Sequence, residues 1–202
     1  STRSAEQVAT FLQESKPCML VIGEGMLADS GLGLGKKVIA NIENGDLPCI
    51  ALRQDGAQGL AVLPNETMDV PLELFSLFSF IQRKVEKHPR QNLRLRVKLP
   101  GMYSIAENEF IMADVLSLSM EGLFFKTAAR LKECDRLTVV FPLLGQCTEI
   151  EVTSTVLYSI EPGPENNYFQ GFGVGFDEIP EQHSQKLRKF IRDCFLKEVS
   201  SS

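Results

Sequence analysis

Hydrophobic and polar residues alternate without interruption between Asn92 and Leu99. One set of alternate positions, here called a parity, carries only apolar side chains, which are Leu93, Leu95, Val97 and Leu99. Because successive side chains of a β-strand point to opposite faces, the pattern predicts a strand that is buried on one side. The other parity is Arg94, Arg96 and Lys98, so we expect the second face to be exposed and basic.

Shorter apolar segments continue this strand pattern as far as residue 176. We expect further strands at about Glu109–Leu116, Gly122–Lys126, Arg136–Pro142, Thr148–Ile160 and Tyr168–Phe176. Turns are predicted at the sequences PGM, ENE, PLLGQ and EPGPENN. Roughly five or six antiparallel strands without intervening helices predict a closed or nearly closed β-barrel.

The last apolar pattern of the chain has helical spacing. Between Pro180 and Lys197, one helical stripe carries Leu187, Phe190, Ile191, Cys194 and Phe195. Such a stripe is typical of an amphipathic helix that packs on a protein core. We therefore expect a C-terminal helix on the barrel.

The first 82 residues show shorter and more varied patterns. A short amphipathic helix is predicted at Ala5–Ser15, followed by a buried strand at the sequence CMLVIG. Short strands are predicted at about Lys37–Ile42, Pro48–Arg53 and Gly59–Leu63, separated by Asn-Gly and Asp-Gly pairs that are typical of hairpins. Val70–Val85 fits either a buried helix or an extended connector. These patterns predict a small β-rich N-terminal domain.

The distribution of charge supports two domains. The formal net charge is −5 at pH 7, and residues 1–82 carry 5 basic against 10 acidic residues, whereas residues 83–202 carry 16 of each. We therefore expect one domain over residues 1–82 and a second over residues 83–202. The composition, 44% hydrophobic and 23% charged, is typical of a globular protein.

Little in the sequence indicates catalysis, a metal site or a membrane. His88 and His183 have no serine or cysteine at a recognisable spacing, so we predict no catalytic residues and no enzyme activity. The 5 cysteines are far apart, which predicts buried free thiols and neither a disulfide framework nor a metal site. No apolar run is long enough for a membrane span and no signal peptide is evident, so we expect a cytoplasmic protein.

The candidate binding residues lie in a basic arm, which we define as residues 83–100. Of its residues, 7 are Lys or Arg and only Glu86 is acidic. An arginine fork can bind phosphate oxygens and the edge of guanine, and its plane can stack on a base. The alternative interpretation is that these charges only keep one face of a strand soluble.

Three segments of the second domain resemble a known family. The sequences HPRQNLRLRVKLPG, LSLSMEGLFFKT and YFQGFGVGFDEIPEQHSQKLRKFIRDCF are similar in order and spacing to the PilZ domain, the bacterial receptor module for cyclic di-GMP. The resemblance covers about residues 83–197. It implies a mainly β protein whose C-terminal six-stranded antiparallel barrel is closed by an α-helix. With a β-rich N-terminal domain, the layout is similar to that of flagellar-brake proteins.

The resemblance implies a set of ligand-binding residues, which are Lys84, Lys87, Arg90, Arg94, Ser117, Ser119 and Gly122. In the family's Arg-x-x-x-Arg motif, Arg90 fits the second arginine, but Glu86 replaces the first. Arg90 and Arg94 also have the Arg-x-x-x-Arg spacing, but this match would place the motif one step into the predicted strand. In the motif Asp/Asn-x-Ser-x-x-Gly, Ser119 and Gly122 match while Ser117 replaces the acid or amide.

These departures predict weakened binding of cyclic di-GMP. Losing one charge-assisted contact removes about 1.5–3 kcal/mol, equivalent to roughly a tenfold to hundredfold loss of affinity. Lys84 or Lys87 could replace part of the missing charge, but not the planar stacking of an arginine.

Two functions follow from the resemblance. The first is a non-enzymatic adaptor that responds to cyclic di-GMP and controls motility or surface behaviour through protein contacts, for example at the flagellar motor. The alternative is a degenerate PilZ domain that does not bind the nucleotide and acts in protein interaction or homo-oligomerisation through Leu74–Ile81 or the last helix. The net charge of −5 disfavours nucleic-acid binding, and no cofactor besides the suspected ligand is predicted.

Overall fold

The chain divides into two compact units, residues 1–91 and 92–202. The computed structural model describes residues 10–11, 14–23, 36–53, 66–87, 92–106 and 109–200. The predicted boundary after residue 82 falls inside helix α4 (Leu74–Val85), so Arg83 and Lys84 belong to the first unit.

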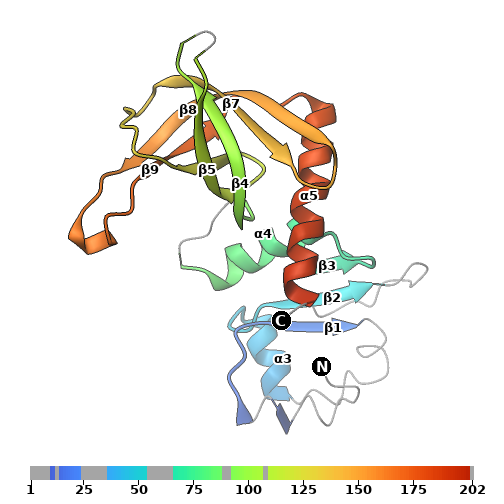
Figure 1. Ribbon diagram of the computed structural model, residues 1–202. Coiled ribbons are helices and arrows are strands. Elements are labelled where there is room, and N and C mark those ends of the chain that lie inside the picture. The colour runs from blue at the N-terminus through green and yellow to red at the C-terminus, as the bar shows by residue number, and fades with distance from the viewer. Residues whose placement is uncertain are drawn as a thin grey trace. The chain divides into compact units, whose positions relative to one another are not determined.

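The second unit is a closed antiparallel barrel (Figure 1). Its strands are β4 (Leu95–Ser104), β5 (Ile111–Leu118), β6 (Gly122–Lys126), β7 (Arg136–Leu143), β8 (Thr148–Ile160) and β9 (Gly171–Phe176). Around the barrel they follow the order β4-β5-β6-β9-β8-β7. The six-stranded barrel and the mainly β fold class are thereby confirmed.

The first strand of the barrel confirms the predicted two-sided pattern. Leu93, Leu95 and Leu99 are buried and Val97 is half-buried, whereas Arg94, Arg96 and Lys98 are all exposed. The buried parity continues to Tyr103, whose ring lies 5.1 Å from that of Phe172 in an edge-on arrangement and 5.5 Å from that of Phe125. The apolar parity of β4 is therefore part of the barrel core.

The turn predicted at PGM is wrong, because β4 runs on through Pro100 and Gly101 to Ser104. Met102 and Tyr103 pair with β5 on one side and with β7 on the other, which holds this stretch extended. A Cβ at Gly101 would lie 2.8 Å from side-chain atoms of Phe125 and Val115. Glycine is therefore placed here by close packing inside the barrel and does not mark a turn.

Strand β9 begins later than predicted. Asn167 and Tyr168 adopt left-handed conformations with φ of 54° and 57°, directly after the 3₁₀ helix η1 (Pro164–Asn166). This turn delays the start of the extended backbone to Gly171. Inside the strand, buried Phe172 and Val174 alternate with glycines.

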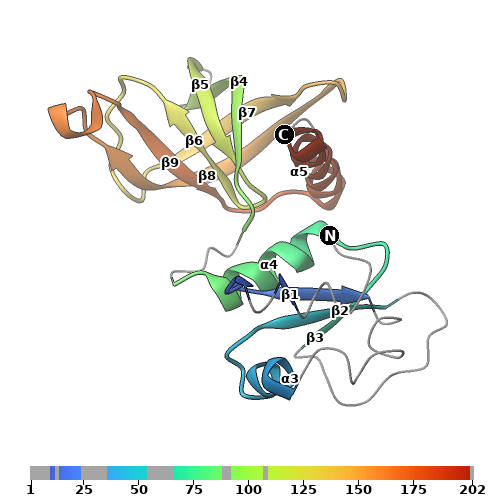
Figure 2. The ribbon, with the colours of Figure 1, turned by 90° about the horizontal axis from the view of Figure 1, so that it is seen from below.

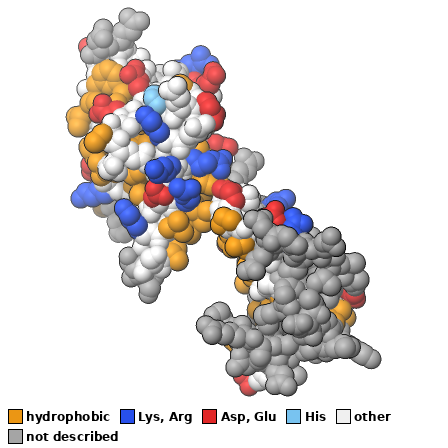
Figure 3. All heavy atoms as spheres, turned by 90° about the vertical axis from the view of Figure 1, so that its right-hand side faces the viewer, with side chains coloured by type: hydrophobic (Ala, Val, Ile, Leu, Met, Phe, Trp, Pro, Cys, Tyr) orange, Lys and Arg blue, Asp and Glu red, His pale blue; other side chains and the backbone are white. Residues whose placement is uncertain are grey.

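The C-terminal helix α5 (Glu181–Ser200) is also confirmed. Its buried residues are Leu187, Phe190 and Ile191, all on the predicted stripe. The opposite side is polar, and Figure 3, which views the side of the barrel unit that carries α5, shows Lys and Arg interspersed with Asp and Glu. Within the described part of the chain, no helix is long and apolar enough to cross a membrane.

The first unit contains a parallel sheet with helices on opposite sides (Figure 2). Its elements are β1 (Leu20–Gly23), α3 (Lys36–Glu43), β2 (Cys49–Arg53), β3 (Glu66–Asp69) and α4. The strand order is β1-β2-β3, and both neighbouring pairs are parallel. Two of the predicted strands, the sequence CMLVIG and Pro48–Arg53, correspond to β1 and β2.

The predicted hairpins of this unit are wrong where the structure describes them. Residues 37–42 lie in helix α3, and the Asn-Gly pair ends that helix: the N–H of Asn44 donates to the carbonyl of Ala40 at 2.9 Å, and Gly45 has φ of 80°. Parallel strands cannot be joined by a tight hairpin and need a crossover, which here contains α3. The strand predicted at Gly59–Leu63 lies outside the described residues.

Two further predicted segments of this unit contain helical residues. Val70–Val85 contains a helix from Leu74 onwards, with the Glu73 carboxylate accepting a hydrogen bond from the N–H of Ser76 at 2.8 Å. Of the predicted helix Ala5–Ser15, the structure describes Thr10, Phe11, Glu14 and Ser15; the first three are helical and Ser15 is not.

All five cysteines are free, as predicted, but they are not all buried. Cys49 is buried in β2 and Cys194 is half-buried, whereas Cys18, Cys134 and Cys147 are exposed. Cys134 and Cys147 lie in turns, with φ of 71° and 47°. Turn positions project side chains toward water, so a small apolar residue type does not by itself predict burial.

We predict that Gly171→Ala destabilises the barrel. A Cβ at Gly171 would lie 2.1 Å from the carbonyl oxygen of Phe125, a backbone atom that can move only by separating β6 from β9. The free energy of unfolding, measured by urea denaturation and circular dichroism, should fall by about 1–3 kcal/mol. Gly175→Ala on the same strand is the control, because its Cβ would meet only the flexible side chain of Leu157 at 3.3 Å. Equal effects of the two changes would contradict the assignment.

We also predict that Cys49 resists thiol reagents in the folded protein. Burial raises the pKa of the Cys49 thiol from 9.0 to about 11, and only the thiolate is a good nucleophile. At pH 8, Ellman's reagent should react promptly with the exposed thiols, and with Cys49 only after unfolding in urea. Because the folded state holds this proton more tightly, this group's contribution to stability is present below pH 9 and is lost as pH rises toward 11.

Candidate functional site

The candidate site lies where β4 begins, on the outside of the barrel. Arg94 directly precedes β4, and Arg96 and Lys98 follow on its exposed face. None of these three cations forms an ion pair with a described residue. Their positive charge is therefore available to an anionic ligand.

Strand pairing places Arg96 directly beside the second motif. Arg96 on β4 is opposite Ser117 on β5, and Ser117 is opposite Phe124 on β6. Directly opposed residues of an antiparallel pair have Cβ atoms about 4.5–5.5 Å apart. Ser117 is half-buried, and its hydroxyl has no hydrogen-bond partner among the described residues. The guanidinium of Arg96 and the Ser117 hydroxyl can therefore contact the same small molecule.

Ser119 and Gly122 form the tight turn between β5 and β6. The Ser119 N–H donates to the carbonyl of Gly122 at 2.8 Å, and the Ser119 hydroxyl donates to the same oxygen at 3.0 Å. The hydroxyl also accepts a hydrogen bond from the N–H of Glu121 at 3.3 Å. Ser119 is buried, so its side chain acts mainly within the turn.

Glycine at position 122 matches the family motif, where a backbone conformation that only glycine adopts cheaply is the expected reason, and the structure shows a different one. Its backbone is not left-handed: the described glycines with positive φ are Gly45 and Gly145. A Cβ at Gly122 would instead lie 2.1 Å from the carbonyl oxygen of Val174 on β9. Glycine is required because the backbones of β6 and β9 approach closely, and this contact fixes the motif turn to the neighbouring strand.

An aromatic cluster borders the site on the side away from Arg96. The Phe124 ring stacks with Phe169 at 5.4 Å and with Tyr158 at 6.1 Å between centroids. Tyr158 lies over Gly173, which is opposite Phe124 on β9, and keeps 37% of its surface exposed. Arginine and hydroxyl groups in one row with the partly exposed Tyr158 ring suit a purine nucleotide, with charge for phosphate and a flat surface for a base, while the buried Phe124 supports that ring from beneath.

The other predicted ligand residues belong to the first unit. Lys84 is in the last turn of α4 and Lys87 follows that helix, and both are exposed. Glu86 is the C-cap of α4, where its N–H donates to the carbonyl of Gln82 at 3.2 Å. Arg90 lies outside the described residues. The structure thus places Ser117, Ser119 and Gly122 around one turn, and Leu95, the residue after Arg94, pairs with Leu118 beside that turn. The seven-residue ligand set remains a prediction.

Sequence reasoning assigned Arg96 to the soluble face of a strand and overlooked Phe124 and Tyr158. Alternation shows that Arg96 points outward, but the strand partner of a residue depends on register, which local patterns do not reveal. In the sequence, only the short separation between the β4 strand and the second motif indicated that these residues could lie close together. Among the described residues, no group of three or more His, Cys, Asp or Glu could hold a metal ion.

The similarity of this chain to known proteins is limited. No curated protein matches the chain. Among solved structures, Bacillus subtilis MotI/DgrA, an inhibitor of motility, has 17% identity and a TM-score of 0.48 over 54% of this chain and 52% of that one. Escherichia coli YcgR in complex with c-di-GMP has 15% identity and a TM-score of 0.47 over 56% and 49% of the two chains. K. pneumonia MrkH in complex with c-di-GMP has 16% identity and a TM-score of 0.48 over 56% and 55%.

The match therefore spans about half the length of each of these proteins, and at this similarity their functions do not transfer to this chain. The family comparison is more direct. The model of the PilZ domain matches residues 87–193, which is more than half of the 202 residues and includes all of the barrel and most of α5. The chain belongs to the PilZ domain family.

Proposed function

We propose that this protein is a non-enzymatic, cytoplasmic adaptor that responds to cyclic di-GMP and controls motility or surface behaviour through protein contacts. The observation that carries the proposal is the position of Arg96 opposite Ser117, in a PilZ barrel where neither Arg94 nor Arg96 has an acidic partner among the described residues. A cyclic dinucleotide offers two phosphates and two bases, and this row offers cations, a hydroxyl and aromatic rings.

In the proposed mechanism, the basic arm and the barrel wall bind different parts of the ligand. Arg90, helped by Lys87 or Arg94, binds phosphate and guanine, while Arg96 and Ser117 bind the ligand from the barrel wall. Ser119 and Gly122 hold the turn that positions Ser117. Contact between the arm and the ligand would change the surface available to a partner such as a motility component.

The same residues support weak binding. Ser117 has a shorter side chain than the Asp or Asn of the family motif, and Glu86 places a carboxylate where the first arginine of the arm is expected. Each missing charge-assisted contact is equivalent to about 1.5–3 kcal/mol. The proposed affinity is therefore at least tenfold below that of a site with the complete motif.

A second candidate function is a PilZ domain that acts only in protein interaction. Four large apolar side chains of one hairpin favour it: Ile105, Phe110, Ile111 and Met112 are between 45% and 65% exposed. They lie around the tip of the β4–β5 hairpin, away from the residues of the candidate site.

Calorimetric titration with cyclic di-GMP tests the first candidate. We expect micromolar binding that Arg96→Ala and Arg90→Ala each weaken roughly tenfold or more, because each removes a charge-assisted contact. Lys98→Ala is the matched control: it removes a cation from the same face of β4 without facing Ser117, and should change affinity by less than about threefold. Absence of heat at millimolar ligand, or equal losses in all three variants, would contradict a specific site.

Restoring the family motif should strengthen binding. In the double variant Glu86→Arg with Ser117→Asp, we expect at least about a tenfold gain in affinity for cyclic di-GMP by the same titration. Glu178→Arg combined with Ser117→Asp makes the same net charge change with the new arginine at an exposed position after β9, and should give no comparable gain. A double variant that binds no better than the parent would show that the missing motif residues do not limit affinity.

A further inference from the structure

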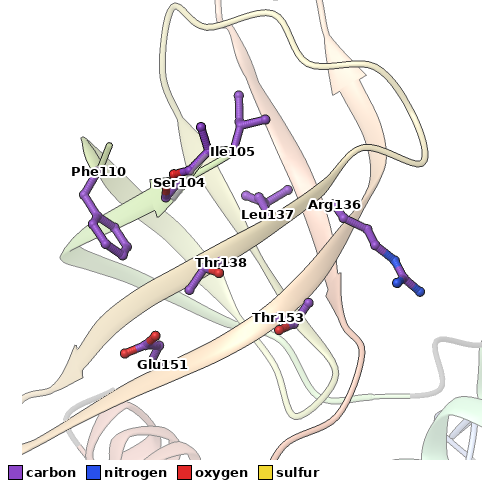
Figure 4. Close-up of a pocket in the computed structure, with 9 residues that line it drawn as sticks. Ser104, Ile105, Phe110, Arg136, Leu137, Thr138, Glu151 and Thr153 are labelled. Atoms are coloured by element: carbon purple, nitrogen blue, oxygen red, sulfur yellow. Dashed lines mark hydrogen bonds between the residues drawn. The ribbon is translucent and has the colours of Figure 1, made fainter. Parts of the chain in front are cut away.

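A pocket of about 390 Å³ lies on the outer face of the barrel under the β4–β5 hairpin (Figure 4). Its lining residues are Ser104, Ile105, Ala106, Phe110, Arg136, Leu137, Thr138, Glu151 and Thr153. The hairpin contributes an apolar wall through Ile105 and Phe110, and β7 and β8 contribute a polar floor. The ligand site proposed above uses none of these residues.

The pocket floor has a positively charged side chain at one end and a negatively charged side chain at the other. Thr138 is opposite Ser104 on β4 and Thr153 on β8, which places these hydroxyls in the middle. Arg136 is opposite Thr155 at one end, and Glu151 is opposite Val140 at the other. Positions 136 and 140 are four residues apart along β7, so the backbone positions that carry the two charges are about 13 Å apart along the strand. Neither Arg136 nor Glu151 forms an ion pair with a described residue.

The pocket continues into an exposed apolar patch. Ile105 is 55% exposed, Phe110 45%, Ile111 47% and Met112 65%, and Met112 is opposite the half-buried Met102 on β4. Single exposed apolar residues are ordinary, but a contiguous group beside a pocket is typical of a protein interface. Methionine side chains are flexible and pack well against varied surfaces.

We propose that this face, formed by the β4–β5 hairpin and the outer surface of β7 and β8, is a two-fold interface with a second copy of this chain. The argument is that its charges are complementary to themselves. A two-fold axis in the plane of contact, passing midway between Arg136 and Glu151, brings Arg136 of each copy opposite Glu151 of the other. The same axis brings the apolar hairpins of the two copies together, and an isologous interface requires this self-complementarity.

The proposal goes beyond the ligand-binding function and concerns different residues from the interfaces predicted from the sequence, Leu74–Ile81 and the last helix. A stable interface buries about 800 Å² on each partner. The pocket alone is too small for that area, so the hairpin must contribute. An unrelated partner protein would need its own matched pair of charges, whereas a second copy carries that pair already.

The test is the mass of the full-length protein, measured by light scattering and analytical ultracentrifugation over a range of concentrations. We expect a reversible dimer. Arg136→Glu and Glu151→Arg should each raise the dimer dissociation constant at least about tenfold, because every single change places like charges together at two symmetric positions. The double variant Arg136→Glu with Glu151→Arg restores opposite charges, and should return the constant to within about threefold of the parent.

Two controls separate this effect from misfolding and from general charge. Lys189→Glu makes the same charge change at an exposed position of α5 and should leave the dimer intact. Met112→Asp should disrupt the dimer, whereas Leu144→Asp, at a 57% exposed position in the β7–β8 turn, should not. Circular dichroism and thermal unfolding should show that all variants fold.

Three results would overturn the proposal. The first is a parent protein that stays monomeric up to the highest soluble concentration. The second is a dimer that is indifferent to Arg136→Glu and Glu151→Arg, which would place the interface elsewhere. The third is a folded double variant that remains as dissociated as the single variants, since reciprocal pairing requires restoration.

Discussion

The close approach of β9 to its neighbouring strands is the constraint on which the barrel depends. Gly171, Gly173 and Gly175 occupy one parity of this strand, so its outer side carries no side chains. The carbonyl of Phe125 and the ring of Tyr158 fill the space that Cβ atoms at Gly171 and Gly173 would occupy. On the inner side Phe172 packs against Tyr103 and Phe125, which link β9 to β4 and β6. The close approach of backbones on the outer side of β9 and the aromatic packing on its inner side therefore both hold this strand in the barrel.

The same constraint builds the candidate ligand site. Gly122 allows β6 to approach the backbone of β9, and this contact holds the turn in which Ser119 bonds to the carbonyl of Gly122. The turn sets the register of β5 against β6, and the pairing of β4 with β5 then brings Arg96 opposite Ser117. The candidate ligand site at the surface is thus positioned by packing beneath it, and a side chain at Gly122 or Gly171, where a Cβ would meet a backbone oxygen of the neighbouring strand, would disturb both the barrel and the site.

The barrel presents two surfaces with different chemistry. The start of β4 carries exposed cations without acidic partners among the described residues, beside a hydroxyl and aromatic rings, which suits a phosphorylated ligand. The tip of the β4–β5 hairpin carries exposed apolar side chains beside a pocket with one cation and one anion, which suits a protein surface. The two surfaces are joined by β4 itself, because Arg96 lies near its beginning and Ser104 at its end. A receptor function and an assembly function can therefore coexist in one domain.

Local sequence determined the elements whose signal is periodic: the two-sided first strand, most of the barrel strands, the C-terminal helix, and a family resemblance that the family comparison confirms. It failed where spatial neighbours decide. PGM is extended because Gly101 fits between Phe125 and Val115. Asn44-Gly45 ends a helix because the strands on either side, β1 and β2, are parallel, and Arg96 faces Ser117 because of strand register. The periodicity of apolar residues shows which face of a helix or strand is buried, because the residues on the buried face are mostly apolar. Which residues meet across strands depends on the register and on the closeness of backbones far apart in sequence, and only the tertiary structure decides these.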